Sequence, residues 1–171
     1  MIKIANFLHK IAVVFDTQNE FDNYMKEHPS ADRSNHSVKS SKEHMDSTLK
    51  QYDDNHSDWP KIHVVNAINE NAHEWGQHVL KKHNINLTKS DFKKAKKFIT
   101  SKNSDNPELL HDDKNLDLAI RNILMVKDNK HPNQFNQALE YRKKPEVVAV
   151  KNMTPGEKHT LLSHIRKAVN Y

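Results

Sequence analysis

The stretch from Trp59 to His83, WPKIHVVNAINENAHEWGQHVLKKH, is the longest uninterrupted periodic run in the chain. Its apolar side chains recur at steps of three and four residues, which places them on one stripe of a helix. The stripe consists of Ile62, Val65, Ile68, Ala72, Trp75 and Val79. The opposite face carries polar residues suited to water, namely His63, Asn66, Glu70, Glu74 and Gln77. Because other helices must cover such a stripe, this stretch predicts a helical bundle.

Further amphipathic segments lie on both sides of this helix. The spacing of apolar residues predicts helices over residues 1–15, 17–28, 40–52, 88–102, 107–124, 133–142 and 154–169. Capping boxes, in which a Ser or Thr precedes a Glu by three residues, mark helix starts at Thr17, Ser40 and Thr154. We therefore expect an all-α, multi-helix bundle with an extended N-terminal helical arm. The expected domains are an arm and polar linker over residues 1–57 and a basic helical body over residues 58–171.

The run from Glu146 to Val150, EVVAV, is the one segment with strand-like composition. A lone strand has nothing to pair with unless another chain supplies a partner. Two interpretations stay open for this run. It adds a strand to the sheet edge of a partner, or it is an ordinary buried connector.

Composition excludes several classes of protein. Two glycines in 171 residues argue against Gly-rich phosphate loops and dinucleotide-binding folds, and the absence of cysteine excludes disulfides and thiol nucleophiles. No apolar run approaches the roughly 20 residues that a membrane-spanning helix requires. Polar residues interrupt the apolar run over residues 1–15 and no small-residue cleavage site follows, so we expect no signal peptide. The expected location is the cytoplasm of a host cell or a virion.

The formal net charge of +5 is unevenly distributed along the chain. Residues 1–58 contain 7 basic and 10 acidic residues, whereas residues 59–171 contain 20 basic and 12 acidic residues. An acidic leader in front of a basic body suggests that the body binds an acidic partner. Self-association between the oppositely charged parts is the alternative.

The segment from His28 to Asp32, HPSAD, is followed by His36 and gives the pattern H-P-x-A-D-x-x-x-H. This pattern resembles the start of uncharacterised proteins from phages and phage-like elements, and the resemblance covers about residues 1–39. It implies a mobile-element or virion setting and no particular activity. The alternative is an ordinary helix–turn junction, because Asp, Ser and Asn readily form turns.

Three clusters of basic residues lie in the body. They are Lys89, Lys93, Lys94, Lys96, Lys97 and Lys102; Arg142, Lys143 and Lys144; and Arg166 and Lys167. Such clusters attract phosphates whatever the base sequence. Only 4 of the 27 basic residues are arginines, and Phe92 and Phe98 fall on the inner face of their helix, which argues against base-edge recognition and base stacking. A solvated lysine face without a ligand is the alternative.

Two Glu-x-x-His pairs, Glu70 with His73 and Glu108 with His111, are weak candidates for metal ligands. Di-iron bundles use this spacing, but they also need a carboxylate from a helix between the two pairs. Residues 75–107 contain no glutamate, and the first pair points away from the apolar stripe. We therefore expect no metal and no other cofactor.

The dipeptides Ser163-His164 and Asp112-Asp113 contain residue types that hydrolases use, but no motif such as G-x-S-x-G surrounds them. The expected function is therefore non-catalytic interaction. We expect a small phage-type structural or assembly component that binds an acidic partner, either a protein or nucleic acid. The alternatives are a sequence-nonspecific nucleic-acid-binding protein and a metal-dependent enzyme.

Overall fold

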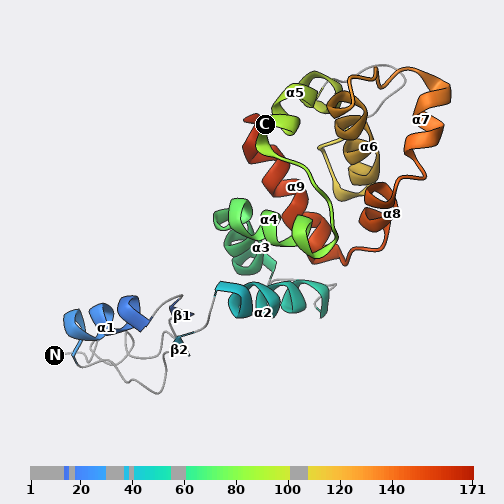
Figure 1. The fold of residues 1–171 in the computed structure, drawn as a ribbon. Helices are drawn as coiled ribbons and strands as arrows, with labels where there is room; N and C mark the ends of the chain where they lie inside the picture. The colour runs from blue at the N-terminus through green and yellow to red at the C-terminus, as the bar shows by residue number, and fades with distance from the viewer. Residues whose placement is uncertain (1–13, 16–17, 30–36, 39–40, 55–60, 101–107) are drawn as a thin grey trace. The chain divides into compact units, whose positions relative to one another are not determined.

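The structure is a computed structural model that describes residues 14–15, 18–29, 37–38, 41–54, 61–100 and 108–171. The chain forms two compact units, residues 1–48 and residues 49–171, which we call unit 1 and unit 2. Apart from one pair of two-residue strands, the described elements are helices (Figure 1), which confirms the all-α bundle. The domain boundary expected after residue 57 lies outside the described residues.

Unit 1 contains a short parallel strand pair and a helix. Strand β1 (Val14–Phe15) pairs with β2 (Ser37–Val38), and α1 (Gln18–Glu27) contacts both strands. The helix expected over residues 1–15 is wrong at its last two residues, because a valine and a phenylalanine suit an extended backbone. Residues 1–13 lie outside the described part.

The H-P-x-A-D-x-x-x-H pattern begins directly after α1. The backbone N–H of His28 donates to the carbonyl of Tyr24 at 2.9 Å, and Pro29 then stops the helix as predicted. Residues 30–36, which carry the rest of the H-P-x-A-D-x-x-x-H pattern, lie outside the described residues.

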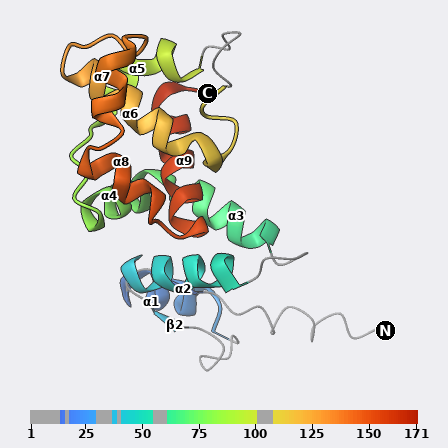
Figure 2. The ribbon, with the colours of Figure 1, turned by 90° about the vertical axis from the view of Figure 1, so that its right-hand side faces the viewer.

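Unit 2 begins within α2 (Ser41–Asp54), whose first residues belong to unit 1. The further helices of unit 2 are α3 (Lys61–Glu70), α4 (Ala72–Lys82), α5 (Lys89–Thr100), the 3-10 helix η3 (Asp113–Asn115), α6 (Leu116–Lys127), α7 (Phe135–Tyr141), α8 (Pro145–Lys151) and α9 (Pro155–Val169). Helix α9 packs on α3, α4 and α5, and α6 packs on α5, α7 and α8 (Figure 2). The core lies where these helices meet and includes the fully buried Phe92, Leu110, Ile120, Leu161 and Ile165. The described helices lack the length and apolar character that crossing a membrane would require.

The single helix expected over residues 59–83 is in fact two helices, α3 and α4, which meet at Asn71. The side-chain Nδ2 of Asn71 donates to the carbonyl of Ala67 at 2.9 Å, and the backbone N–H of Asn71 donates to the same carbonyl at 3.1 Å. An asparagine side chain that competes for a helical carbonyl in this way interrupts a helix.

The apolar stripe of this segment is largely confirmed. Ile68, Ala72, Trp75 and Val79 are buried, and the predicted polar face is exposed. Ile62, however, is 61% exposed, and Val64 is buried in its place. Stripes that begin at residue 62 or at residue 64 both proceed at steps of three and four, so periodicity alone does not distinguish them.

The EVVAV run is helical and forms most of α8, so the strand interpretation is wrong. Pro145 occupies the first helical position and Glu146 lies in the first turn, and both favour a helix start. Val147 and Val150 are buried, whereas Val148 is 43% exposed, which is the spacing of a helix. The packing of α8 on α6 therefore outweighs the preference of valine for strands.

The helix expected over residues 107–124 begins only at Leu116. Residues 109 and 110 form a turn, and the side chain of Asp112 accepts a hydrogen bond from the backbone N–H of Lys114 at 2.9 Å, which caps η3. Aspartate and asparagine favour such turns, and this preference divides the segment before α6 begins. Helices α5 and α7 agree with the predicted segments to within two residues at their described ends, apart from the last two residues predicted for α5, which lie outside the described part.

Candidate functional site

Helix α5 begins at a reciprocal cap formed by Thr88 and Asp91. The Oδ2 atom of Asp91 accepts hydrogen bonds from the Thr88 backbone N–H at 2.9 Å and from the Thr88 hydroxyl at 2.8 Å. The Thr88 oxygen accepts from the Asp91 backbone N–H at 3.3 Å. This cap satisfies donors of the first turn, and the packing of α5 on α6 and α9 fixes which side of the helix faces water.

The outer side of α5 carries five exposed lysines, which we call the lysine face: Lys89, Lys93, Lys94, Lys96 and Lys97. Three of them follow one another at steps of four residues, and each step rises about 6 Å along the helix axis. None of the ion pairs found in the described part of the chain involves any of these five ammonium groups. The lysine face is therefore a strip of positive charge that no ion pair among the described residues neutralises. Lys102, the sixth lysine of the predicted cluster, lies outside the described residues.

The two aromatic residues of α5 differ in their surroundings. Phe92 is fully buried, as predicted. Phe98 is only half-buried; the Lys97 ammonium lies 4.8 Å from its ring centroid, and the ring of His131 meets it edge-on at 5.1 Å between centroids. Neither ring therefore offers an open face on which a base could stack.

The cluster of Arg142, Lys143 and Lys144 is divided by the fold. Lys144 Nζ donates to Asp128 Oδ2 at 2.8 Å, and the Tyr141 hydroxyl donates to the same oxygen at 2.6 Å. These two hydrogen bonds lower the pKa of Asp128, so the charge of Lys144 is balanced within unit 2. Arg142 and Lys143 are exposed.

Arg166 and Lys167 serve mainly to hold the fold. The Arg166 Nε donates to the carbonyl of Leu110 at 2.7 Å, and its Nη2 donates to the carbonyls of Leu110 and His111. Lys167 Nζ donates to the carbonyl of Glu70 at 3.3 Å. These contacts tie α9 to the turn before η3 and to the end of α3, so we do not include this pair in the candidate surface.

The structure does not gather the Glu-x-x-His pairs into a metal site. Glu70, His73 and His111 are exposed, and a hydrogen bond between Glu108 and Tyr171 raises the pKa of that tyrosine. Among the described residues, no group of three or more histidines and carboxylates is arranged to hold a metal ion.

His164 lies in the interior of unit 2 and is only 2% exposed. Its ring meets Phe92 edge-on at 5.4 Å and lies 5.1 Å from the ring of His73. Burial, together with the positive charges of His73 and Lys89, lowers the pKa of His164 to about 4, so the imidazole is neutral near pH 7. Its Nδ1 has no hydrogen-bond partner in the described part of the chain.

Ser163 does not form a nucleophile–base pair with His164. The Ser163 hydroxyl donates to Asn69 Oδ1 at 2.8 Å. Nucleophilic catalysis needs the hydroxyl within hydrogen-bond reach of its base, and here the hydroxyl bonds to an amide instead. Asp112, the other hydrolase-like residue type noted in the sequence, caps η3.

Helix α4 comes unusually close to α9 at Gly76. A Cβ atom built on Gly76 would lie 2.3 Å from Cβ and 2.4 Å from Cγ of His164, far inside van der Waals contact. Glycine in a helix interior costs about 1 kcal/mol relative to alanine. At this position the cost is offset by close packing between the two helices.

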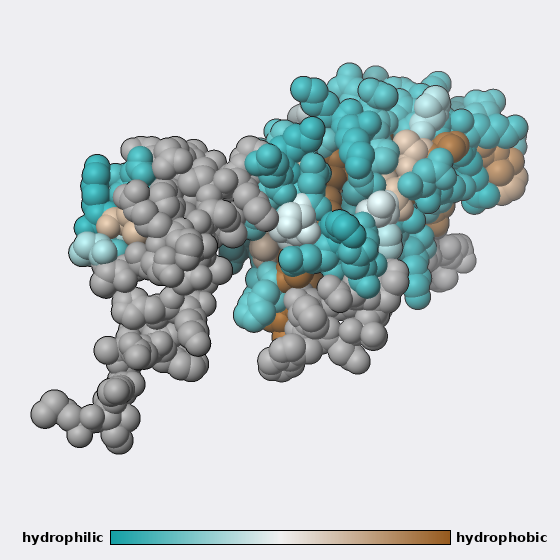
Figure 3. Space-filling model, turned by 90° about the horizontal axis from the view of Figure 1, so that it is seen from below, coloured by the Kyte–Doolittle hydropathy of each residue, from teal (hydrophilic) through white to brown (hydrophobic). Residues whose placement is uncertain are grey.

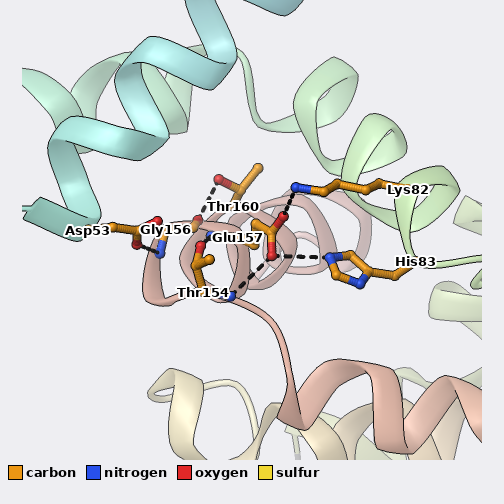
Figure 4. A network of polar contacts seen from close by, with 7 residues as sticks. All are labelled: Asp53, Lys82, His83, Thr154, Gly156, Glu157 and Thr160. Carbon is orange, nitrogen blue, oxygen red and sulfur yellow. Dashed lines mark hydrogen bonds and ion pairs between the residues drawn. The ribbon is translucent and has the colours of Figure 1, made fainter.

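A network of polar contacts fixes the first turn of α9 (Figure 4). Glu157 is 4% exposed; its Oε1 accepts from Lys82 Nζ at 2.7 Å, and its Oε2 lies 3.1 Å from His83 Nε2 and accepts from the Thr154 N–H at 3.0 Å. The Thr154 side chain accepts from the Glu157 N–H at 3.3 Å, which confirms the predicted capping box. Burial alone would raise the pKa of Glu157, but the hydrogen bonds from Lys82, Thr154 and His83 together bring it below its usual value.

The same turn is held from its other side by α2. The Gly156 N–H donates to Asp53 Oδ1 at 2.7 Å, and the Thr160 hydroxyl donates to the Gly156 carbonyl at 2.8 Å (Figure 4). A Cβ on Gly156 would lie 3.2 Å from the carbonyl oxygen of Leu49. Every group in this network is engaged in holding helices together, so we interpret it as structural.

A cavity of about 510 Å³ lies between the end of α4 and the start of α5. Its polar lining includes Gln77, Lys81, Asn84, Asn86, Lys89 and His164, and no acidic residue lines it. Asn84 has φ of 55°, a left-handed conformation that asparagine tolerates and that turns the chain from α4 toward α5. The sequence did not indicate this cavity, because it depends on the approach of α9 to the α4–α5 connection.

The face of the molecule seen from below (Figure 3) is largely polar where its residues are described. Figure 3 shows one face of the molecule, on which most described side chains are hydrophilic and apolar side chains form small separate groups. The exposed large apolar residues include Phe135 at 72% and Leu139 at 39%, one turn apart on α7. Of the features described, the lysine face gathers the most basic side chains that form none of the ion pairs found among the described residues, and the cavity adjoins it.

No protein-family model, no curated protein and no solved structure matches the chain. The function therefore has to be inferred from these surfaces themselves.

Proposed function

We propose that the chain is a non-catalytic interaction protein that binds an acidic partner through the lysine face of α5. One observation supports this proposal above the others: five exposed ammonium groups on one helix face form none of the described ion pairs. Lys144 and Lys82, in contrast, pair with Asp128 and Glu157. A strip of like charges carries a repulsive energy that an acidic partner relieves.

The partner that best suits this strip is the phosphate backbone of nucleic acid, bound without sequence preference. Regularly spaced lysines contact phosphates as point charges, and they supply little of the bidentate geometry with which arginine reads base edges. The aromatic rings of α5 are buried or covered, so base stacking contributes little. An acidic protein of the same assembly is the second candidate, because the resemblance of residues 1–39 to phage proteins implies an assembly setting.

The test is the salt dependence of binding to a mixed-sequence DNA duplex, followed by fluorescence anisotropy. Log affinity should fall linearly with log salt, with a slope of about −0.9 for each phosphate neutralised, or roughly −4.5 if all five lysines engage. The variant Lys93→Glu/Lys94→Glu/Lys97→Glu should not bind. Lys26→Glu/Lys114→Glu/Lys130→Glu makes the same change in net charge at exposed lysines outside α5, and should keep most of the affinity.

Two outcomes would contradict the proposal. One is binding that does not depend on salt, and the other is equal loss of affinity in both triple variants, which would indicate an effect of net charge alone. Parallel titration with polyglutamate separates the two kinds of acidic partner. Salt-sensitive, α5-dependent binding of polyglutamate without binding of DNA would favour an acidic protein.

A further inference from the structure

The cavity beside the lysine face has a positively charged lining. Lys81 and Lys89 line it, and neither takes part in the ion pairs found among the described residues. Asp91 lies in the first turn of α5, but it is 8% exposed, is bonded to Thr88, and lies 3.9 Å from Lys127 Nζ. The Asp91 carboxylate is therefore engaged by Thr88 and Lys127, and we do not count it against the positive charge of the cavity.

The start of α5 adds a further donor at the cavity. Lys89 lines the cavity and lies in the first turn, and none of the hydrogen bonds found in the described part of the chain involves its backbone N–H. Free N–H groups and the positive end of the helix dipole together favour an anion at a helix N-terminus.

A second, independent feature of the cavity is His164. This residue is 98% buried and lines the cavity, and its Nδ1 has no hydrogen-bond partner among the described residues. A buried polar atom without a partner is costly, and native structures retain few of them. Gln77, Asn84 and Asn86 line the same space. Polar residues from α4, from the α4–α5 connection and from α9 therefore meet at this cavity.

We propose that this cavity binds a phosphate monoester, held by the ammonium groups of Lys81 and Lys89 and by the backbone N–H of Lys89 at the start of α5. A phosphate monoester carries a charge of about −1.5 to −2 near pH 7, which matches two ammonium groups better than a carboxylate does. The volume of about 510 Å³ is within the range of sites for small molecules.

The phosphate monoester has two sources with the same chemistry. It belongs to a free small molecule such as a nucleoside monophosphate, or it is the 5′-terminal phosphate of a nucleic-acid strand. In the second case the following phosphates lie along the lysine face, because Lys89 belongs to both the cavity and that face. Only this second source rests on the proposed function.

Calorimetric titration of the full chain with adenosine 5′-monophosphate and with adenosine tests the free ligand. We expect the monophosphate to bind and adenosine to bind at least about tenfold more weakly, since adenosine lacks the phosphate that makes the charge-assisted contacts. Lys81→Gln should weaken binding of the monophosphate about tenfold, and Gln77→Glu should remove it by placing a negative charge at the rim. Lys114→Gln, an exposed lysine away from the cavity, should leave it unchanged.

Anisotropy measurements with two single-stranded oligonucleotides, identical except for a 5′-phosphate or a 5′-hydroxyl, test the strand end. A several-fold preference for the 5′-phosphate that disappears in Lys81→Gln identifies the strand end as the source. If adenosine 5′-monophosphate does not bind and the two oligonucleotides bind equally, the inference is overturned. Binding of the 5′-hydroxyl strand through Lys93, Lys94 and Lys97 would persist in that case, so the proposed function would stand.

Discussion

Acidification should destabilise the chain through His164, which the fold buries in its neutral form. In the unfolded chain the imidazole has its usual pKa near 6.5, whereas burial lowers the pKa of the folded-state group to about 4. Between these values the unfolded chain binds a proton that the folded chain does not bind. The contribution of His164 to stability is therefore complete above pH 6.5, falls as the pH decreases from 6.5 to about 4, and is constant below that.

The size of this effect follows from the two pKa values. At about 1.36 kcal/mol for each pKa unit, the change from 6.5 to about 4 corresponds to about 3 kcal/mol. His159, whose pKa burial also lowers, adds a loss in the same direction. A variant that lacks only His164 is therefore needed to separate the two histidines.

Urea unfolding of the parent chain and of His164→Gln, followed by circular dichroism at pH 7, 6, 5 and 4, makes this comparison. The difference in free energy of unfolding between parent and variant should decrease by about 3 kcal/mol from pH 7 to pH 4. A constant difference would refute the reasoning. An NMR titration of the parent chain provides a test that does not depend on the variant folding, and a His164 pKa near 6.5 would refute it equally.

Two further substitutions test the contacts of α9. Gly76→Ala should destabilise the chain by about 3 kcal/mol in urea unfolding, because the added methyl group overlaps His164. The control variant Asn66→Ala, on the exposed face of α3, should change the free energy of unfolding little. A Gly76→Ala variant that is more stable than the parent would contradict the close approach of α4 and α9. Glu157→Gln should cost about 2 kcal/mol near pH 7, since it leaves Lys82 and His83 without their carboxylate. The folded-state pKa of Glu157 is lowered, so its contribution to stability is present above its usual pKa and is lost as the pH falls through the folded-state pKa. If Glu157→Gln is still less stable than the parent at pH 2.5, in measurements at low denaturant, the carboxylate is not the source of this stability.

Local signals in the sequence were sufficient where one segment determines its own structure. The capping box at Thr154 starts α9 as predicted, and the lysines of α5 are exposed because Phe92, Ala95 and Ile99 take the buried side. The sequence was insufficient where neighbouring helices decide. The valines of α8 form a helix because α6 covers two of them, and α3 buries Val64 in place of Ile62, although both choices satisfy the period.

The lysine face could be predicted from the sequence, whereas the cavity could not. Five lysines on one side of a periodic helix predict a charged surface from the sequence alone. The cavity instead requires that His164, from α9, approach the connection between α4 and α5, which is about 80 residues earlier in the chain. The one local indication was Gly76, a glycine in the middle of a strongly periodic helix, which signals close approach of another segment.

The contact between Gly76 and His164 joins residues 88 positions apart, and this separation has a consequence during synthesis of the protein. At about 5–20 residues per second, the ribosome completes α4 several seconds before it has made α9, the helix on which α4 packs. For that interval the apolar side of the nascent helix is open to chaperones and to other nascent chains. Substitutions that slow the docking of α9 should therefore reduce the yield of folded protein in cells more than they reduce its equilibrium stability.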